Sequence, residues 1–349
     1  FLAFFSIIGD WMMVYNQYDP ELASTSIRPL LNIHFLTSLL LIASFSFIAY
    51  LNRNRHEPLP GLQAATPKSF MQLAIPTILL CTIYFALRIE ITTYWDQLYR
   101  DSSYVNIVEG TDYPTTYYNE NLPWFKEIWA LNYSILFFSL LAFINWRFIR
   151  NKRLARVVIG FGFICIVAFL SQGLLVLNEL RDSYLYLDAS SHYVAGSFNM
   201  TIRYITYAFA GLMLFVLYRT IHKEDLDAQK RKLIIAFDLL FHVSLVIVLS
   251  NEWITWMSFL QYSESTRLGL SILWGMYALL LIILGIWKNK RHLRIGAIVL
   301  FAVTLVKLAL YDISHLDTIA KTIIFVSLGI LLLVISFLYN KYKHLTHPE

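Results

Sequence analysis

The amino-acid sequence predicts an all-α, polytopic transmembrane helical bundle of about ten spans. Of 349 residues, 58% are hydrophobic and only 15% are charged, whereas about a quarter of the residues in a typical soluble domain are charged. Apolar stretches of about 17–25 residues recur along the chain, and each is long enough to cross a hydrocarbon core of about 30 Å as a helix. Because backbone groups in lipid must be hydrogen-bonded within the segment, we expect helices and not barrel strands.

Ten apolar segments are expected to form the bundle. In chain order they are 1–15, 27–50, 70–98, 127–148, 155–180, 200–218, 233–260, 268–287, 293–311 and 322–340. The first is short, ends before Asp19 and Pro20, and has neither a basic leader nor a cleavage site, so it is not a signal peptide. We expect it to be the remainder of a helix in a longer chain, and residues 1–349 to form a single transmembrane domain.

The distribution of Lys and Arg predicts the orientation. Nineteen of the 28 Lys and Arg residues fall in loops 51–68, 147–156, 219–232 and 288–294 and in the tail 340–349. Basic residues in short loops resist translocation, so these loops and the C-terminus are expected on the cytoplasmic side of the membrane. The opposite loops, expected on the outer side, are 16–26, 99–126, 181–199, 261–267 and 312–321.

Two hairpins resemble each other in outline. Each consists of a helix, a basic turn and a second helix that ends in Asn-Glu, at Glu179 in one and Glu252 in the other. Any polytopic protein has hairpins with basic turns, so the matched acidic endings are what favour duplication of a hairpin unit. The expected units are 27–98, 127–180, 200–260 and 268–312, followed by a final helix at 322–340.

Charged side chains at membrane depth are the candidate functional residues, because a charge in lipid is costly and commonly marks a functional site. Counted at 1.5 Å per residue, Lys307 is the deepest, about 20 Å above Arg294 on the cytoplasmic side. The candidates share the outer level of the membrane and carry both signs: Asp10, Arg88, Glu90, Glu179, Arg203, Glu252, Lys307 and Asp312. They are expected either to line an outward-facing cavity or to act as a structural clasp or solvated interface between helices.

A second candidate lies in the inner half. Asp238 and His242 are spaced i, i+4 and share one helical face, so they are a candidate proton relay or a local hydrogen bond. His34 stands alone in its span and is expected to be a satisfied bundle histidine.

Other classes of site are not indicated. Cys81 and Cys165 fall inside apolar spans and show no metal-ligand spacing, so no metal is expected. The sequence contains none of the short catalytic or phosphate-binding motifs, and we expect no cofactor. The net charge of +5 comes from the basic loops, whose positions predict the orientation of the chain in the membrane. The charge therefore does not indicate a nucleic acid partner.

The last 80 residues carry a family resemblance. Its residues are Ser271, Trp274, Gly275, Tyr277, Gly285, Leu293, Arg294, Gly296, Lys307, Asp312, Leu316, Ser327, Leu328, Gly329 and Tyr339. In these positions the chain resembles the bacterial membrane proteins grouped as domain-of-unknown-function family 2339. It departs from them near the end, where Lys321 and "FVSLG" stand in place of an Arg and "SFLG". The resemblance implies a many-helix inner-membrane protein and supplies no reaction.

Three functions remain open on these grounds. The first is transport or handling of a polar or lipid-linked envelope molecule, such as a lipid-linked glycan, through the outer charged set. The second is a structural or assembly scaffold that binds other membrane proteins. The third is an enzyme at the periplasmic face, which the missing catalytic motif disfavours. Membrane lipids are expected partners in each case.

Overall fold

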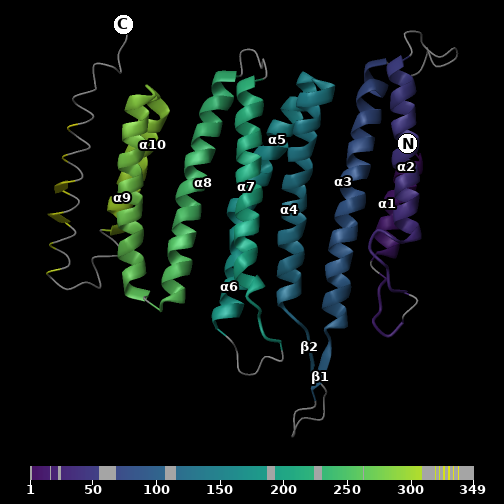
Figure 1. Cartoon of the computed structure of the whole chain (residues 1–349), viewed down its shortest axis with the longest axis horizontal. Helices are drawn as coiled ribbons and strands as arrows, with labels where there is room; N and C mark the ends of the chain where they lie inside the picture. Colours follow the sequence, from purple (N-terminus) through teal and green to yellow (C-terminus); the bar gives the residue numbers. More distant parts are fainter. Residues whose placement is uncertain are drawn as a thin grey trace. The chain divides into compact units, whose positions relative to one another are not determined.

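In the part of the chain that the computed structural model describes, the regular elements are helices apart from one short hairpin (Figure 1). It describes residues 2–15, 17–22, 25–54, 68–106, 115–186, 193–223, 230–261 and 263–308, with single positions between 319 and 337. The elements are α1 (Leu2–Val14), α2 (Ile33–Asn54), α3 (Lys68–Asp101), β1 (Tyr104–Asn106), β2 (Thr115–Tyr117), α4 (Asn121–Ile144), the π-helix η2 (Asn145–Ile149), α5 (Lys152–Ala168), the π-helix η3 (Phe169–Gly173), α6 (Leu174–Leu185), α7 (Phe198–Lys223), α8 (Lys230–Phe259), α9 (Ser263–Trp287) and α10 (Arg291–Lys307).

The helices confirm the predicted fold class. Among the described residues, seven helical stretches are long and apolar enough to cross a membrane: Ile33–Leu51, Ala74–Asp101, Asn121–Ile149, Lys152–Leu185, Phe198–Lys223, Lys230–Phe259 and Thr266–Trp287. Each coincides with a predicted span. The predicted segments 1–15 and 293–311 correspond to the shorter helices α1 and α10, and 322–340 lies outside the described residues except for single positions. The total of ten spans and the side of the C-terminus stay predictions.

The chain forms two compact units, which we describe separately. Unit 1 contains Phe1–Leu141 and Leu175–Gly211, and unit 2 contains Ala142–Leu174 and Leu212–Glu349. The helix pairs α2–α3 and α9–α10 fall where hairpin units are predicted, although the duplication itself stays a prediction.

In unit 1, α1, α2 and α3 pack around a shared apolar core. Because each helix is apolar on nearly all faces, its large side chains meet the neighbouring helices on one side and are left for lipid on the other. Trp11 of α1 also donates its indole N–H to the hydroxyl of Ser38 on α2, at 3.1 Å. The buried core residues are Ile7, Trp11, Phe35, Leu41, Phe45, Ile75, Ile78 and Ala86.

The remaining part of unit 1 joins α4, α6 and the start of α7. The side-chain amide of Asn199 donates to Asn121 and to Ser183, both at 3.0 Å, which ties the beginning of α7 to α4 and α6. The rings of Phe125 and Phe198 stack beside this contact with centroids 5.4 Å apart. The hairpin of β1 and β2 extends beyond the ends of α3 and α4 (Figure 1) and is antiparallel, with Val105 opposite Thr116.

In unit 2, α5 lies close against the second half of α7. A Cβ added to Gly162 would lie 2.7 Å from Leu217 Cδ2, so the absence of a side chain at Gly162 gives the Leu217 side chain its place between the two helices. The π-helix η2 ends at Arg150, which has a positive φ of 53°, and Asn145 accepts a 2.9 Å hydrogen bond from the backbone N–H of Asn151 across this turn. The buried Asn145 therefore fixes the connection into α5.

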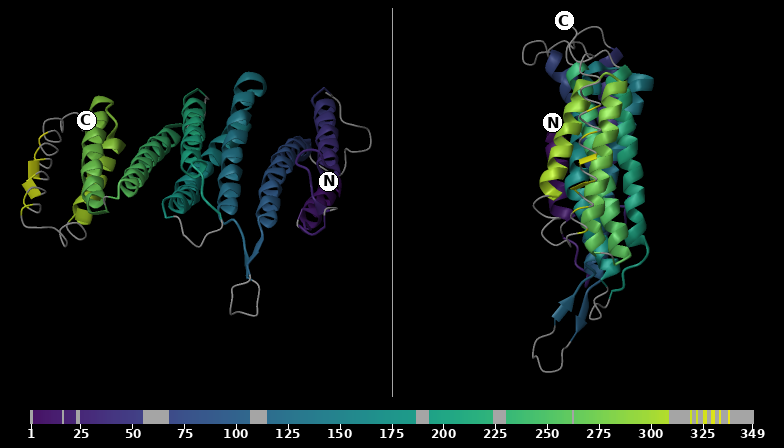
Figure 2. Two further views of the ribbon diagram at one scale, coloured as in Figure 1. Left: turned by 60° about the horizontal axis from the view of Figure 1, so that its bottom comes forward. Right: turned by 90° about the vertical axis from the view of Figure 1, so that its left-hand side faces the viewer.

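Also in unit 2, α8, α9 and α10 pack together, with α9 and α10 side by side (Figure 2). Polar contacts also link α8 to α9. The indole of Trp274 donates to Ser250 at 2.8 Å, and Tyr277 contacts His242 Nδ1 through its hydroxyl at 2.8 Å. The buried apolar core consists of Tyr277, Ala278, Leu281, Ile282, Leu293, Ala297 and Phe301.

Candidate functional site

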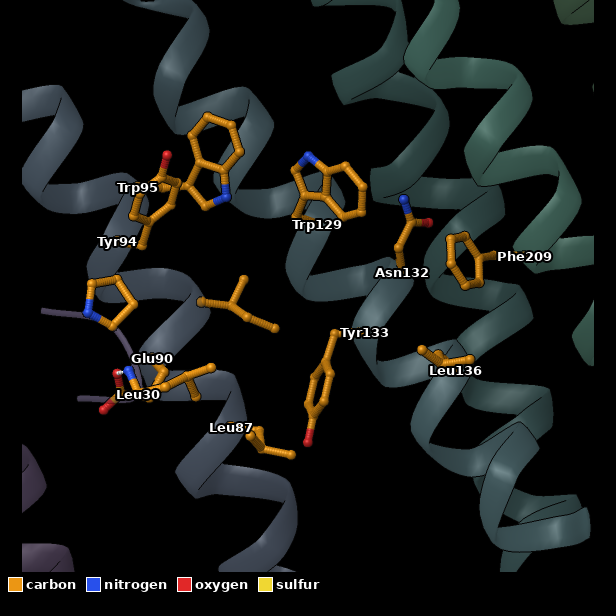
Figure 3. A pocket seen from close by; sticks show the side chains of 12 residues that line it. Leu30, Leu87, Glu90, Tyr94, Trp95, Trp129, Asn132, Tyr133, Leu136 and Phe209 are labelled. Carbon is orange, nitrogen blue, oxygen red and sulfur yellow. Dashed lines mark hydrogen bonds between the residues drawn. The ribbon is translucent and has the colours of Figure 1, made fainter. Parts of the chain in front are cut away.

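Unit 1 contains a cavity of about 520 Å³ between α3 and α4 (Figure 3). This volume is in the range of small-molecule sites, about 300–1,000 Å³. The lining positions on α3 lie in the half of that helix nearer to the β-hairpin, and those on α4 lie around its middle. The lining residues are Pro29, Leu30, Leu87, Glu90, Ile91, Tyr94, Trp95, Trp129, Asn132, Tyr133, Leu136 and Phe209.

The wall of the cavity is mainly aromatic and aliphatic. Trp95 stacks on Phe125 with ring centroids 5.5 Å apart, and this contact holds the indole in place between α3 and α4. Tyr133 donates its hydroxyl to the backbone carbonyl of Tyr84 at 3.0 Å, so its ring faces the cavity while its polar end is satisfied. Tyr94 is 44% exposed and lies at the rim. Such a surface binds an apolar body through burial and ring contacts.

Glu90 closes one end of the cavity and is only 3% exposed. One carboxylate oxygen accepts from the Tyr15 hydroxyl at 2.6 Å and from the Asn32 amide at 2.9 Å. The other accepts from the backbone N–H of Leu30 at 2.8 Å. Three donors thus compensate the burial of this acid, so Glu90 anchors the segment after α1 to α3 and holds Leu30 at the cavity.

Asn132 is the second polar side chain on the wall and is 1% exposed. Its amide nitrogen donates to the Thr206 hydroxyl at 3.1 Å. Within the residues that the structure describes, its carbonyl oxygen Oδ1 is buried without a hydrogen-bond partner. A buried polar atom of this kind costs free energy unless something hydrogen-bonds to it. Asn132 therefore ties α4 to α7 beside the cavity and presents almost no surface to it.

The predicted outer charged residues are divided between the two units. In unit 1, a carboxylate oxygen of Asp10 lies 3.0 Å from His34 Nδ1, and the His34 ring lies edge-on to Tyr15, with ring centroids 6.1 Å apart. Since Tyr15 binds Glu90, the structure links Asp10 to Glu90 through His34 and Tyr15. His34, expected to be a satisfied bundle histidine, has Asp10 as its partner.

The other unit 1 candidates lie apart from this chain of contacts. Arg88 donates to the Tyr84 hydroxyl at 3.2 Å on its own helix. Glu179 is exposed on α6, whereas Arg203 is 1% exposed on α7. Neither of these two lines the cavity.

The unit 2 candidates have their own surroundings. Lys307 donates to the backbone carbonyl of Arg267 at 2.9 Å and to Ser271 at 2.8 Å, and its ammonium lies 6.0 Å from the centre of the Trp274 ring. Glu252 is half-buried on α8. Asp312 lies outside the described residues. Since these residues belong to unit 2, their relation to the unit 1 candidates stays a prediction.

The proposed relay pair contacts residues other than each other. Asp238 Oδ2 accepts from Lys290 Nζ at 2.5 Å and contacts His292 Nε2 at 2.8 Å. His242 contacts the Tyr277 hydroxyl. The polar contacts on this face of α8 therefore run to α9 and to the start of α10. Searched over the described residues, no group of three or more His, Cys, Asp or Glu side chains is arranged to hold a metal ion.

Comparison with known proteins places the chain in a family. Residues 114–342, about two thirds of the sequence, match the family model described as "Predicted membrane protein (DUF2339)". The chain belongs to the DUF2339 family. No curated protein and no solved structure matches it.

The DUF2339 match confirms the resemblance seen in the last 80 residues and extends it toward the N-terminus. It includes the α4 and α7 wall of the cavity, with Asn132 and Phe209, and begins after the α3 wall. The cavity of this DUF2339 protein is thus built partly within the family region and partly before it.

Sequence reasoning missed the polar residues that shape this cavity. A search for charges at membrane depth found Glu90 and passed over Asn132, although "WALNYSIL" places a neutral amide in the middle of an apolar span. Tyr15 and Asn32, which bind Glu90, lie directly after α1 and directly before α2. No periodic pattern in the sequence marks these positions. An amide in the middle of an apolar span, such as Asn132, should therefore be considered together with the charged residues when a site is sought in the sequence.

Proposed function

We propose that this protein binds an amphiphilic molecule of the bacterial envelope, one with a lipid-like apolar body, in the α3–α4 cavity. The observation that carries the proposal is the composition of the wall, which is mainly aromatic and aliphatic and has Glu90 at one end. Sites for small amphiphiles combine a mainly apolar surface with a few polar groups in this way.

The membrane setting supports the same ligand class. The basic loops are expected on the cytoplasmic side of the inner membrane, so the half of α3 that lines the cavity belongs to the outer leaflet. Glu90 lies eleven residues before the end of α3 at Asp101, a depth of about 16 Å below that end. A molecule entering here has its body at the level of the acyl chains. We propose that handling such molecules at the outer leaflet is the role of this protein.

A cavity-filling substitution tests the proposal. Leu136 lines the cavity on α4, and Leu140, one turn further along the helix, is 52% exposed and does not line it. Leu136→Trp is expected to fill the cavity, whereas Leu140→Trp adds the same indole to the lipid-facing surface. Native mass spectrometry of the full chain, released from detergent micelles, measures the lipid that each variant retains.

The expected result is a bound amphiphile on the wild-type protein and on Leu140→Trp, and its loss from Leu136→Trp. Circular dichroism of the three proteins checks that the helical content is unchanged. Equal retention by both variants overturns the proposal, as does a wild-type protein that never holds a lipid beyond the nonspecific background of the detergent.

A second candidate function, a scaffold for protein partners, is favoured by the β-hairpin. Its described residues Tyr104, Val105 and Tyr117 are 40%, 56% and 46% exposed, and tyrosine is enriched in binding surfaces. Replacing the two tyrosines with Ser is expected to abolish crosslinks from the hairpin to a membrane partner in cells, while Leu136→Trp leaves them unchanged. The opposite pattern removes this candidate.

A further inference from the structure

We propose that Arg28 binds the headgroup of the ligand at the rim of the α3–α4 cavity, and that this headgroup is a phosphate at the end of the apolar chain that lies inside. This inference rests on the proposed function, because it concerns the same cavity. It adds the chemical class of the headgroup and the residue that binds it.

The segment between α1 and α2 is fixed to α3 at two points, one on each side of Arg28. Gln97 accepts from the backbone N–H of Ile27 at 3.2 Å and donates to the carbonyl of the same residue at 3.1 Å. Glu90 accepts from the backbone N–H of Leu30 at 2.8 Å. Because both anchors belong to one helix, Arg28 is held beside α3 between the levels of Gln97 and Glu90.

These anchors place Arg28 at the rim of the cavity. The two residues that follow it, Pro29 and Leu30, line the cavity. Tyr94 lies between the two anchors on α3, on the same side of the cavity as Leu30, and is 44% exposed (Figure 3). Arg28 is itself exposed, so a headgroup that protrudes from the cavity on this side meets a guanidinium.

Neighbouring cations of unit 1 are already engaged, whereas Arg28 is available. Lys126 on α4 forms an ion pair with Asp96 at 2.7 Å. Arg100 on α3 donates to the backbone carbonyl of Tyr18. Among the residues that the structure describes, Arg28 forms no ion pair. A guanidinium offers paired N–H donors that match two phosphate oxygens, so a phosphate is the headgroup that this rim fits best.

The interior of the cavity keeps the phosphate at the rim. None of the twelve lining residues is Lys, Arg or His, so a phosphate inside would lose its hydration without gaining a cation. Glu90 is buried and its carboxylate oxygens already accept from three donors, so it offers an anion only a charge of the same sign. The apolar chain therefore occupies the cavity, and the phosphate stays outside it.

The depth of the rim agrees with this division. The 34 residues of α3 make a helix of about 50 Å, which extends about 10 Å beyond each side of the hydrocarbon core when it is centred. Gln97 and Glu90 lie about 6 Å and about 16 Å below the end of α3 at Asp101. The level of Arg28 between them thus includes the boundary of the core, where the phosphates of lipids lie.

The test uses photoaffinity labelling of the protein in nonionic detergent, with a diazirine-bearing hexadecanol and mass-spectrometric mapping of the labelled peptides. The competitors hexadecyl phosphate, hexadecanol and hexadecyltrimethylammonium share one chain. Labelling of α3 or α4 peptides that line the cavity is expected to be displaced by about three- to tenfold less phosphate than alcohol. This range lies between the worth of an exposed ion pair and that of a hydrogen bond to a charged group. The ammonium compound should compete least.

Three variants assign the preference to Arg28. Arg28→Gln removes the charge, so the phosphate and the alcohol are expected to compete equally. Arg28→Lys keeps the charge without the paired donors and should retain part of the preference. Arg267→Gln removes the same charge from an exposed arginine of α9 in unit 2 and should leave the preference unchanged. Circular dichroism checks that the variants are folded.

Two further competitors distinguish the sources of such a headgroup. Phosphatidic acid carries the phosphate on a diacylglycerol, and farnesyl phosphate carries it on an isoprenoid chain. The compound that competes at the lower concentration identifies the source, and its advantage over the corresponding uncharged alcohol should be lost in Arg28→Gln. An advantage that this variant keeps contradicts the role of Arg28.

The outcomes separate the two levels of the proposal. Saturable labelling of the cavity with equal competition by hexadecyl phosphate and hexadecanol in the wild-type protein overturns the role of Arg28 and leaves the proposed function standing. A preference for the phosphate that survives Arg28→Gln, or that Arg267→Gln abolishes to the same extent, also overturns it. Labelling that is absent from the cavity, or unaffected by Leu136→Trp, overturns the proposed function itself.

Discussion

The hydroxyl of Tyr15 lies 2.6 Å from a carboxylate oxygen of Glu90, so the segment after α1 is tied to the middle of α3 by a hydrogen bond between residues 75 apart in sequence. The same oxygen also accepts from the Asn32 amide at 2.9 Å, so Tyr15 is one of the three donors that compensate the buried acid.

Replacing Tyr15 with Phe is expected to destabilise unit 1 by about 1.5–3 kcal/mol, because Glu90 stays buried and loses one of its three donors. Thermal unfolding of the wild type and of Tyr15→Phe in detergent measures the difference. Equal unfolding temperatures would contradict this account.

Gly269 is expected to be indispensable for the packing of α8 on α9. A Cβ at this position would overlap the indole of Trp253, and the indole is held by a 3.2 Å hydrogen bond to the backbone carbonyl of Thr266. Gly269→Ala should cost about 1–3 kcal/mol through overpacking, which outweighs the roughly 0.5–1 kcal/mol gained from the better helix propensity of Ala. Thermal unfolding in detergent measures the difference.

The matched control is Gly296→Ala in α10. An added Cβ there meets nothing within 4 Å, so helix propensity alone acts and the variant should be neutral or slightly more stable. If both substitutions shift the unfolding temperature equally, the close approach at Gly269 is not the cause.

Asp238 and Lys290 are expected to be energetically coupled. Their side chains are 13% and 29% exposed and their charged atoms are 2.5 Å apart, so the pair is shielded from water on most sides. A double-mutant cycle with Asp238→Asn and Lys290→Met should give a coupling free energy of about 1–2 kcal/mol. The same cycle with Lys288→Met, an exposed lysine two residues earlier, should give a value near zero. Similar coupling for both lysines would show a general charge effect and not a contact.

The helices of this protein can be predicted from its sequence because the requirements for crossing a membrane are met within each segment. A segment in lipid must satisfy its own backbone and must be apolar, so length and composition predict α8, expected at 233–260 and observed at Lys230–Phe259. The helix extends further toward the basic turn because polar residues continue a helix into the interface without cost.

The partners of the buried polar residues do not follow from such local rules. Spacing along α8 pairs Asp238 with His242, yet the structure gives Asp238 partners 52 and 54 residues away, at the turn into α10. Glu90 likewise takes its donors from the irregular chain around Leu30 and Asn32. These contacts depend on how helices and loops meet in space, which hydropathy and periodicity do not encode.

The orientation of the chain is the remaining assumption behind the outer-leaflet cavity, and it can be measured. Ser103 lies next to the β-hairpin, and His222 lies in the last turn of α7, within the predicted basic segment 219–232; both are exposed. In a background in which Cys81 and Cys165 are replaced by Ala, a membrane-impermeant maleimide applied to spheroplasts should label Ser103→Cys. It should label His222→Cys only after the membrane is permeabilised, because the basic loops resist translocation. The reverse pattern would place the cavity in the cytoplasmic leaflet, where an amphiphile would enter from the side on which lipids are made.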